Sequence, residues 1–76
     1  MNNSRRKKIN NSVLSLTGAK ERLQKALAEE KTALSRVPSD NEHEEMREAM
    51  DEIITGLEDA LSSLDEALDT LNNADF

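Results

Sequence analysis

Apolar positions are most regular in the second half of the chain. From Met46 they recur alternately four and three residues apart as far as Ala74. This is the heptad spacing of a helix that packs along one stripe. The stripe consists of Met46, Met50, Ile53, Leu57, Ala60, Leu64, Ala67, Leu71 and Ala74. Ile54, Leu61 and Leu68 widen it, so this helix is expected to have neighbours on more than one side.

The first half of the chain follows the same spacing less strictly. Seven of the nine heptad positions between Ile9 and Val37 are apolar, and the exceptions are Lys20 and Glu30. The apolar members are Ile9, Val13, Leu16, Leu23, Leu27, Leu34 and Val37. Gly18 interrupts the segment, and since glycine costs about 1 kcal/mol relative to alanine inside a helix, it marks a kink, a break or a close contact.

Pro38 separates the two periodic segments. The residue before a proline is pushed out of the helical conformation, so the first helix should end near residue 36. Ser39 and Glu42 then have the spacing of a capping box, which favours the start of a second helix. We predict one all-α domain over residues 1–76, an antiparallel two-helix hairpin with helices over about 5–36 and 40–72 and a turn at 37–41. Helices of this length give a rod of about 45 Å.

The composition indicates that this hairpin does not stand alone. The 76 residues include no Cys, Trp or Tyr and a single Phe, and so short a chain gains only about 3–5 kcal/mol from its own core. We expect a homo-oligomer, most simply a dimer that closes a four-helix bundle. Its core seam would contain Ile9, Val13, Leu16, Leu23, Leu27, Leu34, Met50, Ile53, Ile54, Leu57, Leu61, Leu64, Leu68 and Leu71. The chain lacks an apolar run long enough for a membrane span or a secretion signal, which predicts a cytoplasmic protein.

Charge is segregated between the two halves. Residues 1–38 contain nine Lys or Arg and three Glu, whereas residues 39–76 contain one Arg and thirteen Asp or Glu, which leaves a net charge of −6. In an antiparallel hairpin the basic start would lie beside the acidic end of the second helix. These clusters are Arg5, Arg6, Lys7 and Lys8 on one side and Asp65, Glu66, Asp69 and Asp75 on the other. Exposed ion pairs contribute only about 0–1 kcal/mol each, so we interpret the segregation as a device that sets register.

A hairpin folded about residues 38–39 makes specific pairing predictions. It places Glu30 level with Arg47, which we predict to form an ion pair. It places Lys20 level with Leu57 and Glu58. It also brings Gly18 nearly level with Gly56, which suggests a close helix contact, a notch for a ligand or a hinge.

The chain offers little chemistry of a catalytic or metal site. It has no Cys, and the one His, His43, has no serine placed to use it as a base. The run from His43 to Arg47 begins like a zinc-protease helix but has arginine where the second histidine is required. Four carboxylates, Glu45, Glu48, Asp51 and Glu52, share a helical neighbourhood as in the all-helical nucleotide pyrophosphatases, yet the seam beside them is apolar. We therefore predict no enzyme activity, metal or cofactor.

The basic start has two interpretations. It is either a solvated helix start answered by the acidic end, or part of a pocket for a small polyanion, such as a signalling nucleotide, where several copies meet. The candidate phosphate ligands are Arg5, Arg6, Lys7, Lys8, Lys20 and Arg22. Nucleic-acid binding is disfavoured because the chain is acidic and lacks aromatic residues for stacking. The acidic second helix could instead imitate a nucleic-acid backbone and block a basic site on another protein.

Several short features resemble small uncharacterised helical-hairpin proteins of phages and mobile elements. They are the basic Arg5-Arg6-Lys7, Glu29-Glu30, Val37-Pro38 at the bend, Glu48-x-Met50 and the heptads Leu57, Leu61, Leu64 and Leu68. The turn over residues 39–43 departs from the Glu-Ser-Leu-Gln type of that group. The resemblance implies a counter-defence or host-takeover factor that acts by stoichiometric binding in the host cytoplasm.

Two functional hypotheses follow. The first is an oligomer that sequesters an anionic signalling nucleotide at its subunit contacts. The second is a protein-interaction module whose helix faces or acidic surface occupy a host protein.

Overall fold

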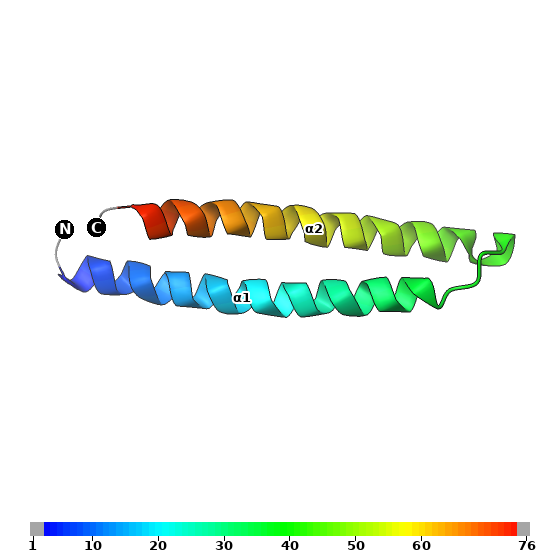
Figure 1. Cartoon of the computed structure of the whole chain (residues 1–76), viewed down its shortest axis with the longest axis horizontal. Helices are drawn as coiled ribbons and strands as arrows, with labels where there is room; N and C mark the ends of the chain where they lie inside the picture. The colour runs from blue at the N-terminus through cyan, green and yellow to red at the C-terminus, as the bar shows by residue number, and fades with distance from the viewer. Residues whose placement is uncertain (1–2, 75–76) are drawn as a thin grey trace.

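The computed structural model describes residues 3–74, which form two long helices joined by a turn. Helix α1 spans Asn3–Ser35, a short 3-10 helix η1 spans Asn41–His43, and α2 spans Glu44–Asn73. The helices lie antiparallel and pack against each other in a rod of 60 × 15 × 13 Å (Figure 1). This confirms the predicted all-α two-helix hairpin, and α1 continues through Gly18 without a break. Neither long helix of the described chain has an apolar stretch sufficient to cross a membrane.

Helix α2 supplies the most buried side chains of the hairpin. Ile54, Leu61 and Leu68 are 8%, 9% and 7% exposed, and α1 has no buried residue. All eight heptad positions within α1, including Lys20 and Glu30, are half-buried instead, and so is Val37 just after the helix. Two helices can cover only one side of each other, so most of the seam keeps partial contact with solvent.

The row of α2 that faces α1 includes only part of the stripe that begins at Met46. It runs through Arg47, Met50, Ile54, Leu57, Leu61, Leu64, Leu68 and Leu71, all of which are buried or half-buried. Met46 and Ile53 are 54% and 51% exposed, and Ala60, Ala67 and Ala74 are exposed as well. Ile53, predicted as a core residue, is therefore not covered within one hairpin.

Two ion pairs define how the helices are aligned. Lys20 Nζ pairs with Asp65 Oδ1, and Lys31 Nζ lies 3.6 Å from Glu58 Oε2. Lys20 is therefore level with Asp65 and not with Leu57, a difference of about eight residues from the predicted register.

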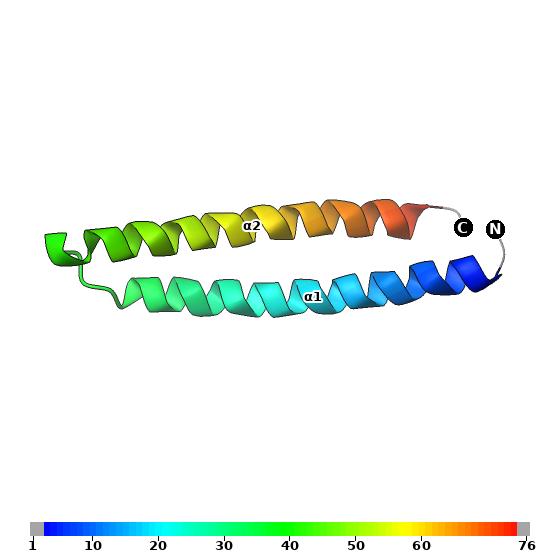
Figure 2. The ribbon, with the colours of Figure 1, turned by 180° about the vertical axis from the view of Figure 1, so that it is seen from behind.

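The helices are consequently staggered. The start of α1 projects past the end of α2 at one end of the rod, and η1 with the start of α2 projects past α1 at the other (Figures 1 and 2). The stagger explains why the rod is 60 Å long and not the expected length of about 45 Å.

The turn accounts for the changed register. Backbone bonds from Arg36 N to the Ala33 carbonyl and from Val37 N to the Leu34 carbonyl, each 3.1 Å, close the end of α1. Eight residues, 36–43, then separate the two helices. A connection of this length carries the chain beyond α1 before α2 begins.

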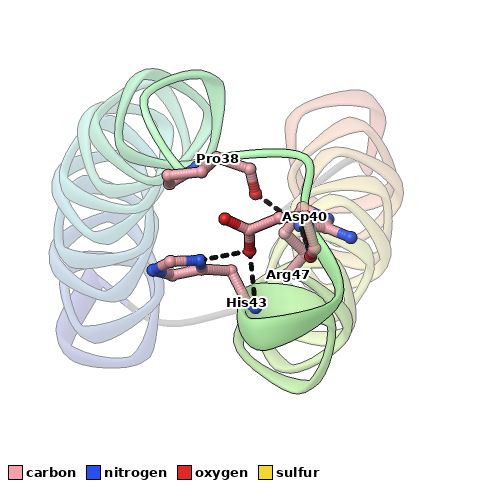
Figure 3. A network of polar contacts seen from close by, with 4 residues as sticks. All are labelled: Pro38, Asp40, His43 and Arg47. Carbon is pink, nitrogen blue, oxygen red and sulfur yellow. Dashed lines mark hydrogen bonds and ion pairs between the residues drawn. The ribbon is translucent and has the colours of Figure 1, made fainter.

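Asp40, and not the predicted Ser39, starts the next helical segment. Its Oδ1 accepts a hydrogen bond of 3.1 Å from His43 N and lies 2.5 Å from His43 Nδ1 (Figure 3). Arg47 holds the other side of the turn, because its Nη1 donates to the carbonyls of Pro38 and Asp40. The predicted ion pair between Glu30 and Arg47 is thus not formed in the described chain. The guanidinium instead bonds to backbone oxygens of the turn.

The close helix contact expected at the two glycines is also not found. A Cβ atom built on Gly56 would have no neighbour within 4 Å, and one on Gly18 would meet only Arg22 Nη1 at 3.4 Å, on the same helix. The observed register also separates Gly18 from Gly56 along the rod. Neither glycine is required by the packing of α1 on α2.

Replacing Gly56 with alanine is expected to raise the free energy of unfolding by about 0.5–1 kcal/mol, because alanine is the better helix former and the added methyl group meets open space. Urea unfolding followed by circular dichroism measures the change. Gly18→Ala is the comparison and should gain less, since its methyl group touches Arg22. A loss of stability in Gly56→Ala would contradict the open surroundings of this position.

Replacing Arg47 with methionine is expected to lower the free energy of unfolding by about 1–2 kcal/mol, because two turn carbonyls lose their donor while the apolar stem is kept. The same urea titration measures it. Glu30→Gln is the control and should change stability by less than about 0.5 kcal/mol. Equal losses in both variants would indicate that the two side chains act as a pair.

Candidate functional site

The basic start of α1 lies at one tip of the rod. Arg5, Arg6, Lys7 and Lys8 occupy the first turns of α1 and are exposed. Because of the stagger, this segment projects past the last turn of α2 (Figures 1 and 2). The positive end of the helix dipole adds to the four side-chain charges, so the tip carries a concentrated positive potential.

The described carboxylates predicted to lie beside this cluster are elsewhere. Asp65 pairs with Lys20, twelve residues along α1 from Lys8, which corresponds to about 18 Å along the helix axis. The negative charge of Asp69 also interacts with Lys20. The predicted side-by-side placement of the two clusters is therefore wrong for Asp65 and its neighbours, and Asp75 lies outside the described residues.

Lys20 interacts with two carboxylates of α2. The hydrogen bond with Asp65, then the charge of Asp65 and more weakly that of Asp69, raise the pKa of Lys20 above its ordinary value of 10.5. A raised lysine pKa means that the contact favours the folded state below pH 10.5 and is lost only as the pH rises through the higher folded-state value. The ion pair is thus intact at neutral pH.

The six candidate phosphate ligands fall into two separate groups within one hairpin. Arg5 to Lys8 form the tip, whereas Lys20 is paired with Asp65 and Arg22 lies near Gly18 on its own helix. A pocket that includes all six is not present in a single chain. Only Arg5 to Lys8 lie together, in the first turns of α1.

The two ion pairs also distinguish the two sides of the hairpin. Lys31 meets Glu58 and Lys20 meets Asp65 along the same edge of the helix contact. On α2 this side repeats every seven residues as Glu44, Asp51, Glu58 and Asp65, all exposed. We call this side the charged face.

The opposite side of the hairpin is apolar. Residues five apart lie about 140° apart around a helix, so Ala26 points away from Lys31 and Ile53 away from Glu58. Because Lys31 and Glu58 meet on one side, the alanine row of α1 and the Ile53 row of α2 share the other. The residues of this apolar face are Ala19, Ala26 and Ala33 from α1 and Met46, Ile53, Ala60 and Ala67 from α2.

The surface of α2 next to the apolar face is also free of charge. The adjoining row contains Ala49, Gly56, Ser63 and Thr70. None of these four residues or of the four that α2 contributes to the apolar face is charged, although eleven of the 30 residues of α2 are. Charge is thus excluded from a strip two rows wide and about 36 Å long from Met46 to Thr70.

The apolar face was only partly predictable. Its α2 members are present in the heptad stripe from Met46, but the sequence placed that stripe against α1. The signal for an uncovered row was the extra width given by Ile54, Leu61 and Leu68, since two helices cannot cover both rows. The alanines at seven-residue intervals in α1 were the matching signal on the other helix.

The other candidate sites have fewer polar or charged groups arranged to bind a ligand. A shallow hollow on α1 is lined by Ala28, Glu29, Thr32, Ala33 and Arg36. His43 Nδ1 lies 2.5 Å from Asp40 Oδ1 within the turn. Between residues 3 and 74, no group of three or more His, Asp or Glu side chains is arranged to hold a metal ion.

Comparisons of the chain with protein-family models, with curated proteins and with solved structures found no match. The apolar face and the basic tip are therefore the two surfaces from which a function is inferred.

Proposed function

We propose that the chain is a non-enzymatic binding protein and that the apolar face is the surface through which it docks on the helices of a protein partner. The observation that carries this proposal is the exposure of Met46 and Ile53, at 54% and 51%, within a strip that contains no charge. A highly charged monomer has little reason to keep charge off one long strip of its surface. Contiguous exposed apolar surface of this kind marks interaction sites.

The shape of the face suits helical partners. Its members recur every seven residues on both helices, which is the spacing of side chains that interlock with a neighbouring helix. Seven of the eleven residues in the face and the adjoining row are alanine or glycine, so a partner backbone can approach closely. Met46 adds an adaptable side chain at one end.

The proposal predicts contact-dependent crosslinking. A photoreactive benzoylphenylalanine at position 53 should form covalent protein adducts in the cells that produce the chain, whereas the same residue at position 58, on the charged face, should form few. Denaturing gels and mass spectrometry give the yield and identity of the adducts. Equal yields at the two positions, or none at position 53, would refute docking through this face.

A second function, capture of a small polyanion, is favoured by the stagger of the helices. We propose that the basic tip binds phosphate groups of an anionic signalling nucleotide at the end of the rod, as a counter-defence factor of a phage would require. Helix starts with nearby arginines bind phosphate through backbone amides and paired guanidinium hydrogen bonds. The projection of the tip beyond Asp65 and Asp69 supports this proposal.

Titration calorimetry against cyclic and ADP-ribose-type nucleotides tests the second function. Arg5→Glu with Arg6→Glu should abolish binding and leave helicity unchanged, because both positions are exposed. Lys25→Glu with Arg36→Glu makes the same change in net charge elsewhere and should retain binding. Binding that survives the first pair, or a panel in which no nucleotide binds the wild-type protein, would exclude the tip as the site.

A further inference from the structure

We propose that the partner of the apolar face is a second copy of this chain, packed so that the two turns lie at opposite ends of a four-helix bundle. The inference rests on the proposed docking role of the apolar face and names its occupant. It is carried by the surface area of the hairpin, the symmetry of the apolar face and the charges at the two ends of the rod.

The hairpin exposes more surface than a folded chain of its size usually does. Its accessible area is 5780 Å², whereas a monomer of 8.5 kDa is expected to expose roughly 4650 Å². The difference of about 1100 Å² is somewhat more than the roughly 800 Å² that each partner buries in a standard interface. A second copy seated on the apolar face would thus bring the chain to ordinary burial.

The same packing would complete the apolar stripe of α2. Met50, Leu57 and Leu64 are half-buried at the contact with α1, and Ile53 and Ala60 lie on the apolar face beside them. A helix placed against that face covers both rows at once. The heptad stripe would then form the centre of a four-helix bundle.

The apolar face is self-complementary about its middle. Ala26 is the central alanine of the α1 row, and the two ion pairs place it level with about residue 60, near the centre of the α2 row. A two-fold axis through this point sets α1 against α1 and α2 against α2, both antiparallel. It places Ala19 opposite the partner's Ala33 and Ile53 opposite the partner's Ala67, so that a large side chain meets a small one.

Charges beside the face favour the same arrangement. Arg22 lies next to the alanine row and comes level with the partner's Glu30, and the symmetry makes this pair twice. Between the two acidic α2 helices, the uncharged row that contains Gly56 and Ser63 keeps carboxylates apart. Without that row, two helices with ten carboxylates and one arginine each would repel.

The ends of the rod complete the argument. The projecting basic tip of each chain comes alongside the projecting turn of the other, which carries Asp40, Glu42 and Glu44. The alternative arrangement, with both turns at one end, would gather two basic tips at one end and two acidic turns at the other. Opposite charges at the two ends of one rod therefore select the antiparallel pairing.

Sedimentation equilibrium of the wild-type chain and two matched variants tests the occupant of the face. The wild-type protein should sediment as a dimer at tens of micromolar. Ile53→Glu with Ala60→Glu should weaken the dimer by at least about 100-fold, because two carboxylates would be buried without partners. Thr55→Glu with Ser62→Glu adds the same charge on the outer surface of α2 and should leave the dimer constant within about threefold.

Single cysteines test the arrangement in an otherwise unaltered chain, since the sequence contains no cysteine. Ala60→Cys lies beside the proposed axis and should form a disulfide-linked dimer on mild oxidation. Thr55→Cys, on the outside, should not. With the turns at one end, Ala60→Cys would instead link to Ala26→Cys when the two variants are mixed.

Each result decides the proposal. A dimer that is sensitive at positions 53 and 60 and crosslinks through Ala60→Cys supports it. Three results overturn it. The first is a wild-type chain that stays monomeric at a concentration 100 times the dissociation constant of a typical specific dimer. The others are a dimer equally sensitive to both variant pairs, and crosslinking only between Ala26→Cys and Ala60→Cys. If the chain is monomeric yet position 53 still crosslinks to a different protein in cells, the docking function stands and only the choice of partner is wrong. If the glutamate variants fail to fold, the cysteine results alone decide.

Discussion

The limited cover that two helices can give each other governs this molecule. A pair of helices buries one row of side chains well, and here that row is Ile54, Leu61 and Leu68, each 7–9% exposed. Every other apolar position of the described chain remains at least partly accessible to solvent. Helical stability in proteins comes mainly from packing of an apolar face, so a hairpin with half of its stripe uncovered retains unused capacity for association.

The two sides of the hairpin use this constraint differently. On the charged face, Lys20 and Lys31 reach across to form ion pairs with Asp65 and Glu58. On the apolar face, the small alanine side chains leave the edge of the contact between α1 and α2 accessible. The charged face is thereby closed by polar contacts, whereas the apolar face has the composition of an interface core.

The sequence was sufficient for the fold because its signals are local. Heptad spacing located both helices and Pro38 located the turn, and each depends on residues near one another in the chain. The register was not predictable, because it depends on how far the turn carries the chain. That distance is set by the cap at Asp40 and by the bonds of Arg47 to Pro38 and Asp40, which no periodicity encodes.

The facing row of α2 was predicted wrongly for another reason. The rows through Ile53 and Ile54 are both apolar, and only three-dimensional packing decides between them. Of the candidate site, the basic tip was evident from residues 5–8, whereas its distance from Asp65 followed from the register and could not be anticipated.

The heptad repeat also has a kinetic consequence. Because Leu57, Leu64 and Leu71 recur at the same interval as Leu16, Leu23 and similar residues of α1, sliding one helix past the other by seven residues restores nearly the same apolar contacts. Slipped hairpins are therefore close competitors of the native one, and the hydrophobic seam alone discriminates poorly among them. The discrimination is left to a few polar groups, above all Lys20 with Asp65 and the clamp of Arg47 on the turn. Such a chain therefore folds by sampling helix registers that differ by seven residues, and the charged groups select the native register in the last step.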